Sequence, residues 1–217
     1  MGGIVIADYG VGNIFSVYHA FEVVGAVAAV TKDPAEVRQA DRLVIPGVGD
    51  FANCMERLAR QGFRDEVLAF AETGRPLLGI CVGMQILFDS SAENGPTPGL
   101  GLLPGTVERI PAAGLDGARL KFPNTGWFDI DPPKDGNWES SVLASLSPGD
   151  AMYFMHGYVP SPSNPLGIKP GSEGGTAVAP AAVANAIVHA LKEFGVKHIE
   201  LPATPERVWR AMEQASP

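Results

Sequence analysis

The residue best suited to chemistry is Cys81, a thiol between two glycines in the run Gly79-Ile80-Cys81-Val82-Gly83-Met84-Gln85. The apolar segment Pro76-Leu77-Leu78-Gly79-Ile80 before it is typical of a short buried strand, and helix-forming residues follow from Val82 to Phe88. A thiol at such a strand-to-helix turn is a nucleophile elbow, and we expect the helix N-terminus to lower its pKa. A buried cysteine without chemistry is the commoner alternative, but it leaves the flanking glycines without a purpose.

A second glycine-rich turn ends the apolar run Leu43-Val44-Ile45-Pro46-Gly47-Val48-Gly49-Asp50-Phe51. Glycines permit backbone conformations that are closed to other residues, so the amides of this turn can face the thiol. We therefore predict that the amides of Val48 or Gly49, with that of Val82, stabilise the oxyanion of a tetrahedral intermediate. Alone, the turn is a weak signal, because most turns of this kind only connect a strand to a helix.

Several short motifs occur in order over residues 1–160: Asp8-Tyr9-Gly10-Val11-Gly12-Asn13-Ile14, Pro46-Gly47-Val48-Gly49, Gly79-Ile80-Cys81-Val82-Gly83-Met84-Gln85, Gly99-Leu100-Gly101-Leu102, Gly126-Trp127 and Tyr153-Phe154-Met155-His156-Gly157-Tyr158. Together they resemble the glutamine amidotransferase subunits of imidazole glycerol phosphate synthases, a class I (triad) family. The resemblance implies that Cys81 attacks the side-chain amide of glutamine, releases ammonia and leaves a thioester that water hydrolyses. It also implies a heterodimer with a cyclase subunit of histidine biosynthesis, and it places Gly47 and Gln85 at the bound glutamine.

The general base of this chemistry is missing from its expected place. The family supplies a histidine and a carboxylate in a His-Pro-Glu segment, which this sequence lacks. The four histidines of the chain are His19, His156, His189 and His198. The first and third fall in predicted helices, at residues 13–24 and 181–194, and the second matches a family strand near the bound glutamine. His198 and Glu200 are spaced i, i+2 in a predicted strand and so share one face, which makes them the candidate base and its carboxylate partner.

From residue 164 onward the sequence resembles a different family, the C-terminal end of the large subunit of molybdenum hydroxylases such as xanthine and carbon monoxide dehydrogenases. The matching segments are residues 164–175, 179–186 and 201–209. The resemblance places Glu173 at that family's active-site glutamate and gives His198 no catalytic role. A molybdenum enzyme is excluded by size, because Glu173 alone cannot bind a molybdopterin. We therefore predict neither a cofactor nor a metal.

The charge distribution changes near residue 160. Residues 1–160 contain 19 Asp plus Glu against 11 Lys plus Arg, and residues 161–217 contain 5 against 5, so the first part carries the whole net charge of −8. The segment 159–165 has the proline and serine density of a linker or turn. We predict a C-terminally incomplete amidotransferase domain over 1–160 and a foreign tail over 161–217. Two alternatives stay open: a non-catalytic protein that docks on the cyclase, and a chimeric product without stable function.

Strand and helix signals alternate along the first part of the chain. Strands are expected at 3–7, 26–30, 42–45 and 76–80, and helices at 13–24, 51–60 and 63–72. This alternation predicts an α/β fold with a mostly parallel sheet covered by helices on both faces, in which the tail replaces the last strands and helix. Shorter strands at 107–110, 126–130 and 151–155 indicate antiparallel or mixed additions. The turn Asp8–Asn13 does not fit the Gly-x-Gly-x-x-Gly fingerprint of a dinucleotide-binding loop. It is explained by a strand-to-helix turn in which Asn13 caps the helix. The family resemblance implies that this turn faces the cyclase.

Composition limits the remaining classes of function. The acidic balance and the absence of Lys/Arg clusters in the sequence argue against nucleic acid as a partner. No apolar run approaches the about 20 residues of a membrane span, so we expect a soluble, cytoplasmic protein. The two cysteines give no disulfide framework, and Cys54, in a predicted helix, is expected to serve packing.

Overall fold

The computed structural model describes residues 3–111, 113, 122–131 and 146–162. The helices are α1 (Ile14–Val23), α2 (Pro34–Val37), α3 (Phe51–Arg60), α4 (Phe63–Glu72) and α5 (Val82–Gln85). The strands are β1 (Ile4–Ala7), β2 (Ala28–Thr31), β3 (Arg42–Gly47), β4 (Leu77–Cys81), β5 (Phe88–Ser91), β6 (Thr97–Pro98), β7 (Leu103–Arg109), β8 (Asn124–Ile130), β9 (Asp150–His156) and β10 (Tyr158–Pro162).

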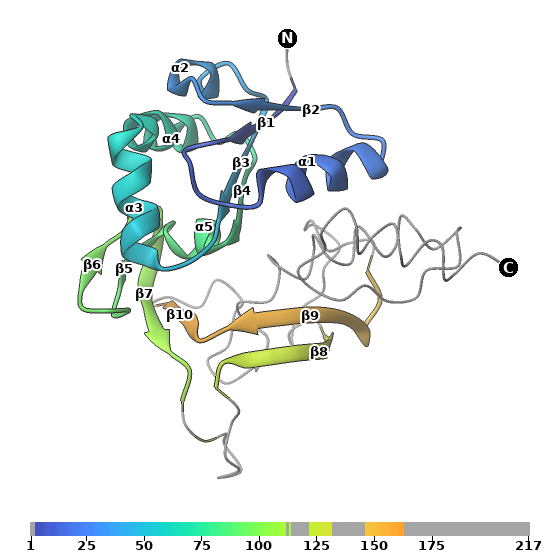
Figure 1. Ribbon diagram of the computed structural model, residues 1–217, viewed down its shortest axis with the longest axis vertical. Helices are drawn as coiled ribbons and strands as arrows, with labels where there is room; N and C mark the ends of the chain where they lie inside the picture. The colour runs from blue at the N-terminus through green and yellow to red at the C-terminus, as the bar shows by residue number, and fades with distance from the viewer. Residues whose placement is uncertain (1–2, 112, 114–121, 132–145, 163–217) are drawn as a thin grey trace, which may run out of the picture.

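The first four strands form one parallel sheet in the order β2-β1-β3-β4. Helix α1 covers one face of this sheet, and α3 and α4 cover the other (Figure 1). The α/β fold with helices on both faces is therefore confirmed. In this arrangement β3 and β4 lie side by side, so the turns that follow them meet at one end of the sheet.

Alternating apolar residues explain why both faces are covered. Leu43 and Ile45 of β3 pack into the large core with α3 and α4, whereas Val44 between them packs with Val17 of α1. Successive strand residues point to opposite faces, so an uninterrupted apolar run is what a doubly covered strand requires.

The helix boundaries follow from local capping. The Asp50 carboxylate accepts a hydrogen bond from the Asn53 backbone N–H at 2.9 Å and begins α3 at the predicted residue. The Asn13 side chain accepts from the Ser16 N–H at 3.3 Å, which confirms the predicted cap of α1. The predicted bounds of α3 and α4 are confirmed, and those of α1 and β2 differ by one or two residues.

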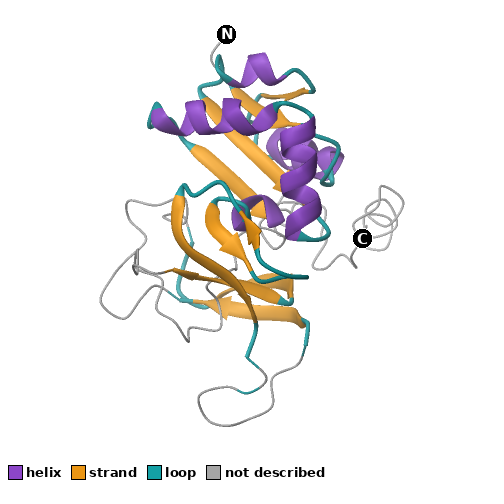
Figure 2. Cartoon of the chain, turned by 90° about the vertical axis from the view of Figure 1, so that its left-hand side faces the viewer, coloured by secondary structure: helices purple, strands orange, loops and turns teal. Residues whose placement is uncertain are grey.

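The remaining strands form the mixed additions that the sequence predicts. A second sheet has the order β10-β7-β5-β6, in which β7 pairs antiparallel with β10 and parallel with β5. Strands β8 and β9 form an antiparallel pair. Figure 2 shows the helices gathered around the first sheet, with these other strands below them.

The predicted linker or turn from residue 159 is wrong up to Pro162. Strand β10 runs through this segment, with Pro160 opposite Val107 and Pro162 opposite Gly105 of β7. It lies at the edge of its sheet, where prolines are tolerated because one side of the strand needs no ladder donors. The division of the chain at residue 160 stays a prediction.

Several predicted features lie outside the described residues, namely the helix at 181–194, the strand at 196–201, and Glu173, His189, His198 and Glu200. Of the helices in the described ranges, none combines the length and apolar content needed to span a bilayer.

Candidate active site

Cys81 occupies a strained backbone position at the end of β4. Its φ of 57° and ψ of −123° lie outside the regions that most residues adopt. Among the described residues other than glycine, only Asn94 shares a positive φ. Such a conformation costs about 1–3 kcal/mol and persists only where the surrounding structure enforces it. The predicted sharp turn at Cys81 is therefore confirmed, with α5 beginning at the next residue.

Three glycines let α5 press directly against the sheet. A Cβ atom on Gly83 would lie 2.0 Å from the carbonyl oxygen of Ile45, and one on Gly79 would lie 2.4 Å from the Cα of Met84. A Cβ on Gly47 would lie 2.3 Å from the backbone nitrogen of Gly83. No side chain fits into these contacts. The glycines on both sides of the thiol therefore allow the backbone of α5 to pack directly against the sheet.

The helix after Cys81 is shorter than predicted. It ends at Gln85, whereas the sequence predicts a helix as far as Phe88. Ile86, Leu87 and Phe88 are all buried, and Phe88 pairs with Leu103 of β7 as the first residue of β5. Ile86 and Leu87 form a buried turn whose carbonyls accept hydrogen bonds from the N–H groups of Leu100, Leu102 and Leu103, so the helix ends where these distant residues bind the backbone.

The glycine-rich turn after β3 lies beside the thiol. In the parallel pairing of β3 with β4, Gly47 is the register partner of Cys81. Gly49 has a φ of 87°, in the left-handed region that favours glycine. The structure thus brings Gly47, Val48 and Gly49 to the same end of the sheet as Cys81. The role of their amides as oxyanion donors stays a prediction.

The pKa of the Cys81 thiol is raised, which corrects the sequence-based expectation. Burial is the main cause, because it disfavours the thiolate, and the negative charge of Glu93 acts in the same direction. A hydrogen bond from the Val82 backbone N–H opposes both. Helix α5 has only four residues, so its dipole is too small to outweigh burial. The thiol is therefore mostly protonated near neutral pH and needs a base to react.

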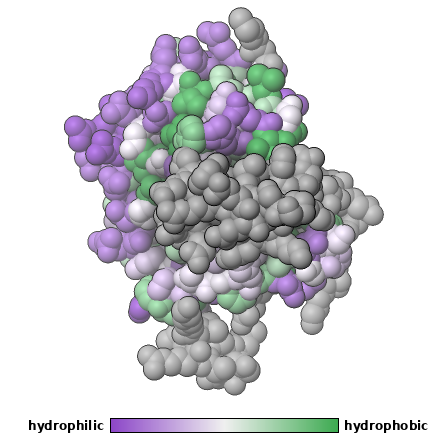
Figure 3. Space-filling model, turned by 45° about the vertical axis from the view of Figure 1, so that its right-hand side comes forward, coloured by the Kyte–Doolittle hydropathy of each residue, from purple (hydrophilic) through white to green (hydrophobic). Residues whose placement is uncertain are grey.

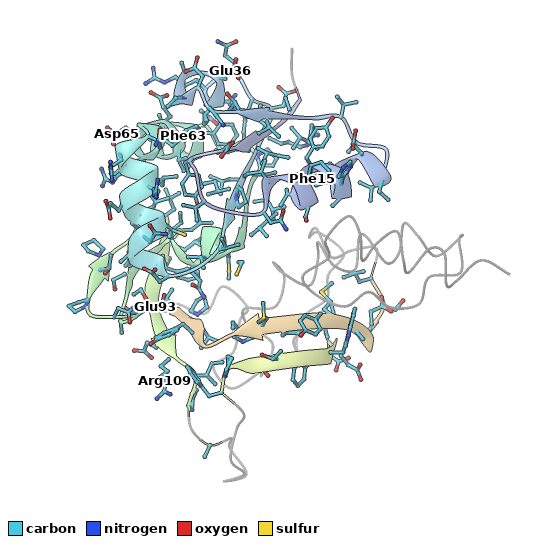
Figure 4. The ribbon with its side chains drawn as sticks, in the orientation of Figure 1. Phe15, Glu36, Phe63, Asp65, Glu93 and Arg109 are labelled. Carbon is cyan, nitrogen blue, oxygen red and sulfur yellow. The ribbon has the colours of Figure 1, made fainter. Side chains whose placement is uncertain are left out.

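Glu93 is a site residue that the sequence analysis missed. It follows β5 and is labelled in Figure 4. Its carboxylate accepts a hydrogen bond of 2.9 Å from the Phe51 N–H at the start of α3. The same carboxylate affects the pKa of Cys81. Sequence analysis finds only a polar, turn-rich segment here, because the contact joins residues far apart in the chain.

Removing the charge of Glu93 is expected to make Cys81 more reactive. In Glu93→Gln the side-chain oxygen can still accept from Phe51, but the thiolate no longer faces a negative charge, so the thiol pKa falls. Alkylation of Cys81 by iodoacetamide at pH 7.5 should become about twofold faster or more, and its pH profile should move to lower pH. Glu56→Gln on the exposed side of α3 is the control and should leave both unchanged. An unchanged profile in Glu93→Gln would contradict this electrostatic role.

Gln85, predicted by resemblance to hold glutamine, is buried at 5% exposure. Its amide nitrogen donates a hydrogen bond to the backbone oxygen of Tyr158 at 3.1 Å. This contact fixes β10 against α5 and places Gln85 between the thiol-bearing turn and the second sheet. Binding of glutamine by Gln85 stays a prediction.

The described histidines do not complete a triad. His19 lies on the surface of α1, 2.6 Å from the Glu22 carboxylate, as expected. His156 lies in β9, where burial lowers its pKa and its ring packs near Phe154. Within the described part of the chain, no histidine is hydrogen-bonded to Cys81, and no cluster of His, Cys, Asp or Glu could hold a metal ion.

The parallel sheet and the elbow at Cys81 define the class of the protein, a glutamine amidotransferase-like α/β protein. A family model described as the CobB/CobQ-like glutamine amidotransferase domain matches residues 6–111. A solved crystal structure of a glutamine amidotransferase superposes with a TM-score of 0.54 at 19% identity and covers 73% of each chain, which shows a shared fold.

More particularly, the chain belongs to the HisH family of imidazole glycerol phosphate synthase subunits. It is 46% identical to HisH of Syntrophotalea carbinolica over 162 residues, which are 74% of this chain and 77% of the relative. HisH of Symbiobacterium thermophilum is 48% identical over 158 residues, which are 73% of this chain and 70% of the relative. HisH 1 of Legionella pneumophila strain Lens is 40% identical over 166 residues, which are 76% of this chain and 78% of the relative. These matches confirm the first resemblance. The resemblance to molybdenum hydroxylases stays a prediction.

Proposed function

We propose that this chain is the glutaminase subunit of an imidazole glycerol phosphate synthase, which hydrolyses glutamine and supplies ammonia to a cyclase subunit in histidine biosynthesis. The observation that carries the proposal is the strained position of Cys81 beside the Gly47–Gly49 turn, in a chain of the HisH family. A cytoplasmic location is part of the same proposal, because glutamine and the other reactants are small and water-soluble.

The proposed reaction is an acyl transfer to sulfur and then to water. The thiolate of Cys81 attacks the side-chain amide carbon of glutamine, and the carbonyl electron pair moves to oxygen. Amides of Val82 and of Val48 or Gly49 stabilise this oxyanion. Collapse of the intermediate, with a proton delivered to nitrogen, expels ammonia and leaves a glutamyl thioester. Water then attacks the thioester, releasing glutamate and restoring the thiol.

Binding and proton transfer need further groups. Gly47 and Gln85 are proposed to hold the substrate glutamine, which is supported by the pairing of Gly47 with Cys81 and by the place of Gln85 on α5, the helix that begins directly after Cys81. His198 and Glu200 are the proposed base and its carboxylate partner. A thiol with a raised pKa makes a base necessary, because a protonated sulfur is a poor nucleophile.

A docking face for the cyclase subunit is supported by the surface around α1. Helix α1 follows the turn Asp8–Asn13, and its Phe15 side chain is 57% exposed. Other exposed apolar residues on α1, β2 and the loop between them are Val23, Val24, Val27 and Val30. Figure 3 shows hydrophobic residues exposed on this side of the molecule. Exposed apolar residues that gather on one face are typical of surfaces where proteins associate.

A non-catalytic, cyclase-binding protein is the second candidate. It is favoured by the lack of His-Pro-Glu in the sequence, together with the raised pKa of Cys81 and the lack of a histidine bonded to it in the described residues. In this case the chain would bind the cyclase subunit but release no ammonia.

The experiment that separates the two candidates uses the full chain with the cyclase subunit and its nucleotide substrate. We expect glutamine-dependent ammonia release, its loss after Cys81 is alkylated by iodoacetamide, and protection of Cys81 by glutamine. Co-purification with the cyclase subunit without any ammonia release would contradict the glutaminase and support the binding protein.

A further inference from the structure

Two buried polar side chains converge on the turn between β3 and α3. Tyr9, which follows β1, is fully buried and donates its hydroxyl to the carbonyl oxygen of Pro46 at 2.5 Å. Cys54, fully buried on α3, donates its thiol to the carbonyl oxygen of Val48 at 3.5 Å. Both contacts lie on the side of the turn that faces the core.

These contacts fix the direction of two backbone amides. A trans peptide unit is planar, and its C=O and N–H point in opposite directions. With the Pro46 carbonyl held by Tyr9, the N–H of Gly47 points the other way, toward β4, and this anchors the first residue of the turn that carries the Val48 and Gly49 amides. With the Val48 carbonyl held by Cys54, the N–H of Gly49 points away from the core. A Cβ on Gly49 would meet no atom within 4 Å, so the space beside this residue is open on that side.

We infer that Tyr9 and Cys54 are positioning residues for the proposed oxyanion hole, because they orient the peptides of the Gly47–Gly49 turn without touching glutamine. This inference rests on the proposed function, since only an acyl-transfer reaction uses these amides. The oxyanion is best stabilised by donors that need no reorganisation during the reaction.

Packing alone does not account for the two polar atoms. A phenylalanine would fill the volume of Tyr9, and a buried hydroxyl is unfavourable unless it is hydrogen-bonded. Burial raises the pKa of the Tyr9 hydroxyl, and it raises the pKa of Cys54 to about 11. Both groups therefore keep their protons at neutral pH and remain donors to the two carbonyls.

The test compares two reagents that alkylate Cys81 by different routes. In a chloromethyl ketone analogue of glutamine, the sulfur first adds to the ketone carbon and forms an oxyanion. The sulfur then moves to the methylene carbon and displaces chloride, and its bond to the ketone carbon breaks as the carbonyl re-forms. With iodoacetamide the sulfur displaces iodide directly, and no oxyanion forms. Tyr9→Phe removes only the hydroxyl, and we expect it to lower the ratio of the two rates about tenfold, a part of the 10²–10³ lost with a whole donor.

Matched variants separate positioning from packing. Tyr18→Phe on α1 loses a hydroxyl that bonds Glu22, and it should leave the ratio unchanged. Cys54→Ala should lower the ratio as Tyr9→Phe does, whereas Cys54→Ser, which keeps a donor, should stay near wild type. An unchanged ratio in both Tyr9→Phe and Cys54→Ala would overturn the inference.

Failure of the proposed function gives a different result. In that case the wild-type chain reacts no faster with the ketone than with iodoacetamide, and glutamine does not protect Cys81 from either reagent. The orientation of the backbone is then followed by NMR. With glycine labelled by ¹⁵N, the Gly47 and Gly49 resonances should broaden in Tyr9→Phe and stay sharp in Tyr18→Phe, because the released peptides exchange between orientations. Sharp Gly47 and Gly49 resonances in Tyr9→Phe would overturn the inference whatever the activity.

Discussion

Replacing Gly83 by alanine is expected to lower the free energy of unfolding by about 3 kcal/mol or more, a large part of the stability of a domain. The added Cβ would lie 2.0 Å from the Ile45 carbonyl oxygen, 2.8 Å from the Ile45 carbonyl carbon and 2.9 Å from that of Pro46. These are backbone atoms of β3, which is held between β1 and β4, so they cannot move aside. Either α5 shifts and displaces Cys81, or the sheet distorts.

Urea unfolding followed by circular dichroism measures this loss. Gly3→Ala is the matched control, because a Cβ at Gly3 meets no atom within 4 Å and its φ is not positive. It should leave the free energy of unfolding within about 0.5 kcal/mol of wild type. If Gly83→Ala were as stable as Gly3→Ala, the close contact between Gly83 of α5 and the backbone of β3 would be disproved.

Local sequence predicts the elements that carry their own boundary signals. Helix α3 begins at the predicted Phe51 because Asp50 caps it, and the turn at Cys81 follows from two flanking glycines. Local sequence does not predict strand β10, because its prolines and serines are typical of a turn and only the pairing with β7 makes it a strand. The sequence places the end of α5 too late for a related reason, since Ile86 and Leu87 form a turn that is hydrogen-bonded to residues 100–103, far along the chain.

The chemistry of the site depends on contacts that local sequence does not encode. The glycines around Cys81 predict a helix N-terminus and therefore a lowered thiol pKa. In the folded chain, burial and the charge of Glu93 raise that pKa instead. Both effects come from residues that reach the thiol only in the folded chain. The same holds for Tyr9 and Cys54, whose partners in the 46–49 turn lie on different elements. Residue type and spacing therefore locate the nucleophile, and tertiary structure decides its reactivity.

Glutaminase activity with the cyclase subunit is expected to fall about 10⁴-fold or more in Cys81→Ala, because no other group can form the thioester. The thiol lies in a strained turn, and alanine keeps its Cβ, so the fold should persist. Co-purification of Cys81→Ala with the cyclase subunit checks this point. Ammonia release close to wild type would exclude Cys81 as the nucleophile.

His198→Ala in the same assay tests the proposed base. If His198 takes the proton of Cys81, its loss should lower the rate about as much as the loss of the nucleophile, since members of a catalytic set act as a unit. Alkylation of Cys81 at pH 7.5 should slow as well, because the raised thiol pKa leaves little thiolate without a base. His19→Ala, on the surface of α1, is the matched control and should retain turnover. Full turnover in His198→Ala would remove the tail histidine from the mechanism and leave the thiol to react without it.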